Sequence, residues 1–283
     1  MERDRASLTA FRVALSRAAH QVHDEPKIFD DPIALEIVGE RWAAAIRANP
    51  RRSRRVASLY LRAFVTARSR IAEDLLHEAV ARGVRRYLVL GAGLDTFAYR
   101  NPHPADVLRV LEVDHPATQA WKRKLLANAG IPLPDSLTFV PVNFETQRLD
   151  ERLREAGLDD DEPVFCSWLG VTMYLTREAF DTTARYLGSR APGSGVIFDY
   201  ALPFRSMSWP LRLYMHFRAR RLRKIGEPWR SFFLPDELAA ILLRAGFART
   251  RDIPPEETNA RFFTGRADRL RISNFAHLMT ASR

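Results

Sequence analysis

The chain has 283 residues, 46% of them hydrophobic, which is enough for one large folded domain with a substantial core. No segment approaches the roughly 20 consecutive apolar residues of a membrane span, and the charged N-terminal region lacks the apolar core of a signal peptide. We therefore expect a soluble, cytoplasmic protein without stable membrane association. The formal net charge of +10 would suit a nucleic-acid partner, but only four of the 44 basic residues are lysine, and the arginines are spread along most of the chain. We attribute this skew to a GC-rich bacterial genome and expect no nucleic-acid partner.

The chain has one cysteine, Cys166, which excludes an internal disulfide and, by itself, a thiolate metal site. It belongs to the apolar run Val164–Trp168, and the sequence places no base for nucleophilic catalysis beside it. We therefore expect a buried core thiol, and we predict no metal site.

Residues 1–57 predict helices joined by loops. Asp30-Asp31-Pro32 predicts a helix start, because an acidic residue caps a helix and proline suits its first position. The run 51–55 contains four arginines and predicts a polar break. From residue 58 to residue 81, apolar residues recur every three or four positions, which predicts a long helix that ends at Gly83.

Short apolar runs then alternate with helical patterns. Strands are predicted at 87–90, 107–113, 137–142, 164–168 and 196–200, with helices at 116–129, 148–156 and 177–187 between them. Apolar strands that alternate with helices indicate βαβ units and a parallel sheet that is buried on both faces. The predicted fold class is α/β, with a Rossmann-like, doubly wound and mostly parallel sheet.

The alternation of predicted strands and helices ends after the fifth predicted strand. Residues 202–230 are rich in Pro, Trp, Arg and aromatic residues, and a helix at 234–245 and a last strand at 271–279 follow them. We predict one domain, 1–283, in four parts: an N-terminal helical extension (1–57), a cofactor-binding core (58–201), a lid insertion (202–230) and a C-terminal part that completes the sheet (231–283).

The clearest chemical signal is the turn Gly91-Ala92-Gly93, which directly follows the first predicted strand. Glycines there let a ligand approach the backbone at the carboxyl end of the sheet. Dinucleotide sites place a third glycine three residues further on, but Thr96 stands there, and Asp95 would repel a pyrophosphate. S-adenosylmethionine has no phosphate, and its sulfonium and amino groups are cationic, so the turn favours this cofactor over a nicotinamide dinucleotide.

Polar residues follow the next two predicted strands. Glu112 and Asp114 end the second strand, where a carboxylate can accept hydrogen bonds from ribose hydroxyls. Asn143 and Phe144 follow the third, and an amide beside an aromatic ring suits an adenine edge and face. Spacing alone leaves open that these are ordinary strand ends.

Four segments together resemble the leucine carboxyl methyltransferase superfamily of class I S-adenosylmethionine-dependent methyltransferases. They are Gly91–Thr96 with Tyr99-Arg100 behind it, Glu112–Pro116 followed by Lys122, Phe29–Ala34, and Trp168–Leu175. They occur in order and at the expected intervals, within a match that runs from about residue 10 to residue 201. The branch that the chain resembles most is bacterial, and relatives methylate carboxylates or hydroxyls of polyketide-like metabolites.

The resemblance implies roles by position. Arg68 matches the arginine that holds the methionine carboxylate, and bidentate guanidinium–carboxylate pairing is chemically apt. Gly91 and Gly93 flank the cofactor, and Asp114, with Glu112, takes the ribose. Two positions depart from the family pattern.

The first departure is Asn143, where relatives often have Asp, although an amide can still hydrogen-bond the adenine. The second is Leu169, where relatives often have Glu, and leucine cannot replace the hydrogen bonds of that carboxylate.

The expected acceptor is a small molecule that is methylated on oxygen, by resemblance only. A carboxylate needs no general base, whereas a hydroxyl would benefit from one. His20, His115 and Tyr174 are candidates, and we expect Tyr174 and His20 in the substrate pocket. Aromatic and methionine residues of the insertion predict an apolar lid over the acceptor: Phe204, Met207, Trp209, Tyr214, Met215, Phe217 and Trp229.

Several alternatives stay open. The chain could bind the cofactor without methyl transfer, act as a nicotinamide-dependent oxidoreductase, or methylate RNA. The basic segment 212–224 could be the solvated edge of the lid, an attractor for an anionic substrate, a membrane-surface helix or an RNA contact.

Overall fold

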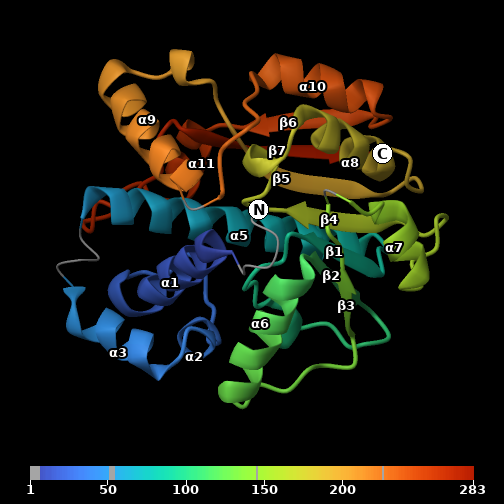
Figure 1. Ribbon diagram of the computed structural model, residues 1–283, viewed down its shortest axis with the longest axis horizontal. Helices are drawn as coiled ribbons and strands as arrows, with labels where there is room; N and C mark the ends of the chain where they lie inside the picture. Colours follow the sequence, from blue (N-terminus) through green and yellow to red (C-terminus); the bar gives the residue numbers. More distant parts are fainter. Residues whose placement is uncertain (1–6, 51–54, 145, 225) are drawn as a thin grey trace.

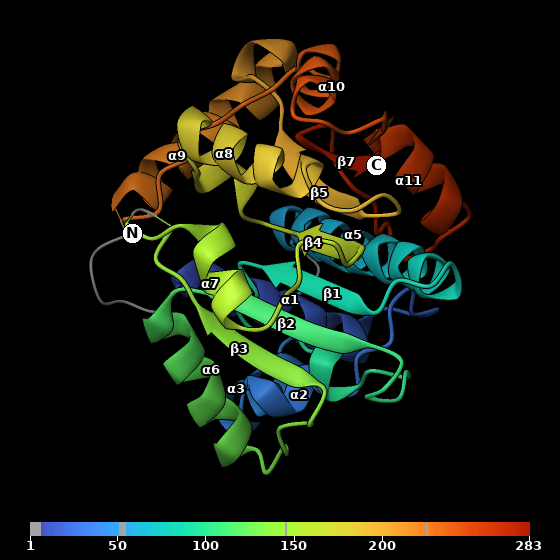
Figure 2. The ribbon, with the colours of Figure 1, turned by 90° about the vertical axis from the view of Figure 1, so that its right-hand side faces the viewer.

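The computed structural model describes residues 7–50, 55–144, 146–224 and 226–283. Its centre is a sheet with strand order β3-β2-β1-β4-β5-β7-β6 (Figure 2). The strands are β1 (Arg86–Leu90), β2 (Arg109–Asp114), β3 (Leu137–Pro141), β4 (Val164–Trp168), β5 (Gly195–Ala201), β6 (Arg249–Ile253) and β7 (Ala276–Ser282). Strands β1 to β5 are parallel, and β7 runs antiparallel to both of its neighbours.

Helices cover both faces of this sheet (Figures 1 and 2). The N-terminal extension contains α1 (Leu8–His23), α2 (Ala34–Ile37) and α3 (Glu40–Ala48). The remaining helices are α5 (Val56–Ala81), α6 (Pro116–Asn128), α7 (Leu149–Glu155), α8 (Arg177–Gly188), α9 (Trp209–Lys224), α10 (Pro235–Arg244) and α11 (Pro255–Phe262). Short 3-10 turns are η1 (Phe97–Tyr99), η2 (Thr172–Tyr174) and η3 (Phe204–Ser206). Within the described residues, no helix combines the length and the apolar character that crossing a bilayer requires.

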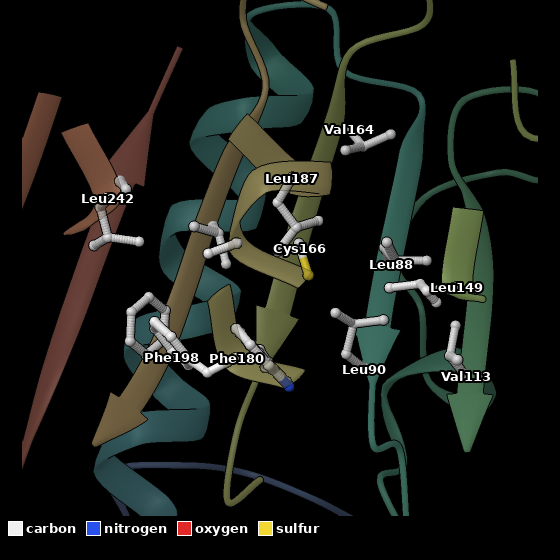
Figure 3. Packing of buried hydrophobic residues seen from close by; sticks show 14 of the residues in the cluster. Leu88, Leu90, Val113, Leu149, Val164, Cys166, Phe180, Leu187, Phe198 and Leu242 are labelled. Atoms are coloured by element: carbon white, nitrogen blue, oxygen red, sulfur yellow. The ribbon is translucent and has the colours of Figure 1, made fainter. Parts of the chain in front are cut away.

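The core has two layers because alternate residues of each strand point to opposite faces. Leu88 and Leu90 of β1 pack with α7, α8 and α10, whereas Tyr87 and Val89 pack with α5. Figure 3 shows the first layer, in which Phe180 and Leu187 of α8 lie against Cys166 and Phe198.

Cys166 is fully buried, as expected, and burial raises the pKa of its thiol. The five apolar runs are confirmed as strands to within one or two residues.

The C-terminal prediction was partly wrong. Strand β7 begins at Ala276 instead of Arg271, because Leu270 and Ile272 pack with Phe29 and Ala63 in a separate cluster. Strand β6 and helix α11 were not predicted. The sequence of β6 is Arg-Thr-Arg-Asp-Ile, a largely polar pattern that suits an edge strand and gives no apolar run.

The predicted helix start at Asp31 was also wrong. Helix α2 begins at Ala34, and its cap residue makes no side-chain hydrogen bond. The carboxylate of Asp31 is fully buried and accepts a hydrogen bond from Thr96 (2.7 Å), with Arg17 and Arg100 at 3.4 and 3.5 Å. Residues 51–54, where a polar break was expected, lie outside the described residues.

The close packing of α8 on the end of α10 generates a stability prediction. A Cβ added at Gly188 would lie 2.2 Å from the backbone oxygen of Ala245, which cannot move aside as a flexible side chain could. We expect Gly188→Ala to destabilise the protein by about 1–3 kcal/mol through overpacking. Thermal unfolding followed by circular dichroism measures this.

Gly195→Ala is the matched control, because its added Cβ would meet its nearest neighbours at an ordinary 3.5 Å. Equal losses in the two variants would contradict the close α8–α10 contact.

Candidate active site

A cavity of about 240 Å³ lies at the carboxyl ends of the parallel strands. Its floor is formed by the segments that follow β1, β2, β3 and β4, and its rim by α1 and the residues after α9. Strand order reverses between β1 and β4, and an open α/β sheet binds ligands at such a switch point.

The turn after β1 brings the backbone to the edge of this cavity. Gly91 and Gly93 adopt φ values of +66° and +52°, which residues with a Cβ rarely tolerate. A Cβ on Gly91 would lie 2.3 Å from Cγ2 of Val171, and one on Gly93 would lie 3.1 Å from Cβ of Ala10. Both glycines are therefore required by the backbone conformation, and Gly91 also by lack of space.

Asp114 faces the turn from the end of β2. One carboxylate oxygen accepts a hydrogen bond from the backbone N–H of Gly93, and the other from that of His115 (2.6 Å). Burial raises the pKa of Asp114, although these two N–H groups and nearby Lys122 act in the opposite direction. Each oxygen keeps a lone pair, so the carboxylate can accept further hydrogen bonds from a ligand.

Asp95 brings a second carboxylate to the cavity. Its Oδ1 accepts from the N–H of Phe97 (2.8 Å), and its Oδ2 lies 3.6 Å from Nη1 of Arg17. Burial alone would raise the pKa of Asp95, but Arg17, Lys122 and Arg100 outweigh it and lower that pKa below its ordinary value. Asp95 is therefore ionised at neutral pH and favours a cation nearby.

Arg68 of α5 reaches the cavity from the opposite side of the turn and is only 7% exposed. Its Nη1 donates to Asp199 of β5 (2.9 Å), which also accepts from the N–H of Gly170. A Cβ on Gly170 would lie 2.9 Å from Nη2 of Arg68, so the glycine leaves room for the guanidinium. The Nε–H of Arg68 is buried and has no hydrogen-bond partner among the described residues, so the protein leaves one donor of this guanidinium unsatisfied.

Three further predicted residues line the same cavity. Asn143 and Phe144 follow β3, and Phe144 packs against the core layer that contains Leu88. Leu169 follows β4 and packs against the other layer. The structure thus brings together every predicted cofactor residue except Glu112: Arg68, Gly91, Ala92, Gly93, Asp95, Asp114, Asn143, Phe144 and Leu169.

The rim combines α1 with the segment 226–230. Glu227 accepts hydrogen bonds from the hydroxyls of Ser7 (2.8 Å) and Thr9, so the start of α1 is joined to the end of the insertion. The N–H of Arg230 donates to the carbonyl of Met173 (2.7 Å), which fixes this segment on η2. Tyr174 also lines the rim, and burial raises the pKa of its phenol.

Glu112 does not line the cavity. It lies two residues before the end of β2, under α6, and Nζ of Lys122 is 2.6 Å from its Oε2, with both side chains 1% exposed. Burial raises the pKa of Glu112. The expected ribose contact at Glu112 is therefore corrected to a buried ion pair.

His20 does not line the cavity either. Its Nδ1 lies 2.8 Å from Asp24, and its Nε2 accepts from the N–H groups of Ile28 and Phe29 (3.2 and 3.4 Å). Both ring nitrogens serve the fold, so the expectation that His20 lies in the substrate pocket was wrong.

The insertion forms a different lid from the one expected. Gly226, Glu227, Pro228 and Arg230 are its cavity-lining residues, and the aromatic side chains expected over the acceptor are not among the lining residues. Three of those aromatic residues are exposed on α9: Trp209, Tyr214 and Phe217.

Sequence reasoning missed Arg17, Asp199 and Glu227. Asp199 carried a signal, because it is the one acidic residue in the apolar run 196–200. No sequence pattern pointed to Arg17 or Glu227, because Asp95 lies 78 residues from Arg17 and the hydroxyl residues that bind Glu227 lie about 220 residues from it.

Comparison with known proteins assigns the chain to a family. A family profile described as leucine carboxyl methyltransferase matches residues 10–188. A Bacillus subtilis protein named "Putative S-adenosyl-L-methionine-dependent methyltransferase YktD" is 32% identical, with 99% of each chain aligned. A Mycobacteroides abscessus protein named "Putative S-adenosyl-L-methionine-dependent methyltransferase" is 31% identical over 66% of this chain and 62% of its own.

Solved structures show the same fold. The structure titled "putative methyltransferase from Thermobifida fusca" aligns with 100% of this chain and 96% of its own, at a TM-score of 0.55 and 16% identity. A DUF574 family protein from Streptomyces avermitilis aligns with 95% and 96%, at a TM-score of 0.51 and 17% identity. The chain therefore belongs to the leucine carboxyl methyltransferase family of S-adenosylmethionine-dependent methyltransferases.

Proposed function

We propose that this cavity binds S-adenosylmethionine and that the protein transfers the methyl group to an oxygen atom, preferably a carboxylate, of a small-molecule acceptor. The observation that carries the proposal is the charge pattern at the switch point. Two carboxylates, Asp95 and Asp114, flank the glycine turn, and the guanidinium of Arg68 lines the same cavity. This pattern complements a ligand with cationic amino and sulfonium groups and one carboxylate.

Each part of the cofactor has a matching group. The guanidinium of Arg68, which lines the cavity, supports binding of the methionine carboxylate, with Asp199 as the residue that positions it. Asp114 accepts from ribose hydroxyls, and Asn143 with Phe144 contacts the adenine. Leu169 adds apolar contact at a position where the family resemblance implies that relatives often have Glu, so ribose recognition depends more heavily on Asp114.

The same charges argue against a nicotinamide-dependent oxidoreductase. A pyrophosphate at the glycine turn would lie beside Asp95, whose pKa is below its ordinary value, and beside Asp114. Anions bind where N–H groups and cations converge, whereas this turn is flanked by carboxylates.

The groups on the rim support an acceptor that is already anionic. When bound, the cofactor supplies an electrophilic methyl group on a cationic sulfur. Nδ1 of His115 accepts from the N–H of Ala117 (3.2 Å), so the neutral ring carries its proton on Nε2 and has no lone pair left for a hydroxyl proton. Tyr174 keeps its proton at neutral pH, because the ordinary pKa of a phenol is already near 10 and burial raises the pKa of this one further, so it can donate a hydrogen bond to the acceptor. A carboxylate acceptor needs no base.

Loss of the Asp114 carboxylate should weaken cofactor binding. We expect Asp114→Ala to raise the Kd for S-adenosylhomocysteine by about 10- to 100-fold, since hydrogen bonds to a charged group contribute about 1.5–3 kcal/mol. Isothermal titration calorimetry measures this, with Asp135→Ala in an exposed loop as control. Unchanged affinity in Asp114→Ala, or binding of NADH in place of S-adenosylhomocysteine, would overturn the proposed cofactor site.

Arg68 can be tested with two ligands. We expect Arg68→Ala to weaken S-adenosylhomocysteine binding by about 10- to 100-fold and to leave 5′-methylthioadenosine, which has no carboxylate, nearly unaffected. Arg70→Ala, on the same helix but exposed and paired with Asp74, is the control. Equal losses for the two ligands would instead mean that Arg68 only supports the fold.

The raised pKa of Asp114 gives the sign of a pH dependence. Only the ionised carboxylate accepts two hydrogen bonds from ribose, so S-adenosylhomocysteine affinity should fall as the pH is lowered through this raised pKa. Calorimetry between about pH 4.5 and pH 8 measures the effect. Asp114→Asn should bind more weakly and lose this pH dependence, and an identical profile in that variant would assign the titration to another group.

A further inference from the structure

Helix α9 presents a second apolar face that the fold does not use. Met215 and Leu222 point inward and are 5% and 3% exposed. Trp209, Leu213 and Phe217 point outward and are 71%, 51% and 62% exposed. Their spacing of four residues places these three side chains in one stripe along the helix. Figures 1 and 2 show α9 at the periphery of the molecule in both views.

Cations surround this stripe. Arg212, Arg220, Arg221, Arg223 and Lys224 are all exposed. None of them pairs with a carboxylate in the parts of the chain that the structure describes. The sequence 209–224 contains no acidic residue, so the outer face of α9 is both apolar and strongly positive.

The positive charge extends from α9 to α1. Arg12 of α1 is partly buried near Arg218 and Arg221, and burial together with these two like charges lowers its pKa. Tyr214 and Tyr174 act in the opposite direction, but neither is a carboxylate. The helix therefore lies in a field that an anionic surface would neutralise.

The apolar stripe and the cations around it together fit some partners better than others. A second copy of the chain, docked face to face, would set the same cations against one another. RNA phosphates would pair with the arginines and bases would stack on Phe217, but RNA offers no apolar partner that buries the aliphatic side chain of Leu213. A bilayer that contains anionic lipids satisfies both features, because apolar side chains enter the headgroup boundary while arginines contact lipid phosphates.

We propose that the outer face of α9 docks the protein onto bilayers rich in anionic lipids, with the helix lying in the plane of the interface. Aromatic and leucine side chains supply the apolar contact, and the arginines supply the electrostatic attraction. This contact is peripheral and reversible, since a single amphipathic segment does not span the membrane. It is compatible with our sequence-based expectation of no stable membrane association, and it does not depend on methyl transfer.

The test is vesicle co-sedimentation of the full chain with phosphatidylcholine alone and with equal parts of phosphatidylcholine and phosphatidylglycerol. We expect at least about tenfold stronger binding to the mixed vesicles, weakening as salt is added. Leu213→Ser/Phe217→Ser and Arg220→Glu/Arg223→Glu should each lose about tenfold of this binding. The control Leu243→Ser/Arg244→Glu, two exposed residues of α10, should bind like the wild type.

A second measurement reports on the helix directly. Trp209 should enter the interface, so mixed vesicles should shift its fluorescence to shorter wavelength, and Trp209→Phe should remove the shift while vesicle binding remains. Circular dichroism and S-adenosylhomocysteine binding verify that every variant is folded.

Four results would overturn the proposal: no vesicle binding, equal binding to both vesicle types, an equal loss in the α10 control, or a dimer in sedimentation velocity that Leu213→Ser/Phe217→Ser disrupts. Salt-dependent binding to RNA that survives Leu213→Ser/Phe217→Ser, without vesicle binding, would assign the face to nucleic acid instead.

Discussion

Buried carboxylates around the turn after β1 are the constraint on which the site depends. A buried ionised group is strongly destabilising unless a cation or several hydrogen-bond donors accompany it. Asp95 has Arg17 of α1 nearby, Asp31 has Arg17 and Arg100, and Glu112 has Lys122 of α6. The N-terminal extension therefore supplies a charge that the cofactor end of the sheet requires, in addition to apolar packing.

The cavity divides into two parts with different construction. The inner part, at the strand ends, consists of the glycine turn and buried charges, which are held by the sheet, by Arg68 of α5 and by Arg17 of α1. The rim consists of side chains from α1, η2 and the segment 226–230, joined by hydrogen bonds from Ser7 and Thr9 to Glu227 and from Arg230 to Met173. Helix α1 is separated from η2 by about 150 residues in sequence and from segment 226–230 by about 200, so these parts of the rim meet only in the folded molecule.

Sequence patterns predicted the strands and turns, which depend on neighbouring residues in the chain. They missed the side-chain contacts between residues that are far apart in sequence. Apolar runs gave the five parallel strands because strands buried on both faces must be continuously apolar. Asp114 and the glycine turn could be assigned because strand ends of a parallel sheet converge on one edge. His20 and Glu112 were misplaced because a polar residue type does not reveal whether its side chain faces a cavity or a buried partner. The lid was misjudged for a related reason, since α9 has apolar residues on two faces and the sequence does not say which one is turned inward.

The separate construction of the two parts bears on how such a protein can diversify. Substitutions on the outer turns of α1 or in segment 226–230 alter the rim of the cavity, while Gly91, Asp114 and the Arg68–Asp199 pair remain untouched. Additive behaviour is the rule for sites that share no partners. The rim can therefore diversify through small, independent substitutions while the glycine turn and its buried charges stay constant, which makes this architecture tolerant of evolutionary change at one end of its cavity.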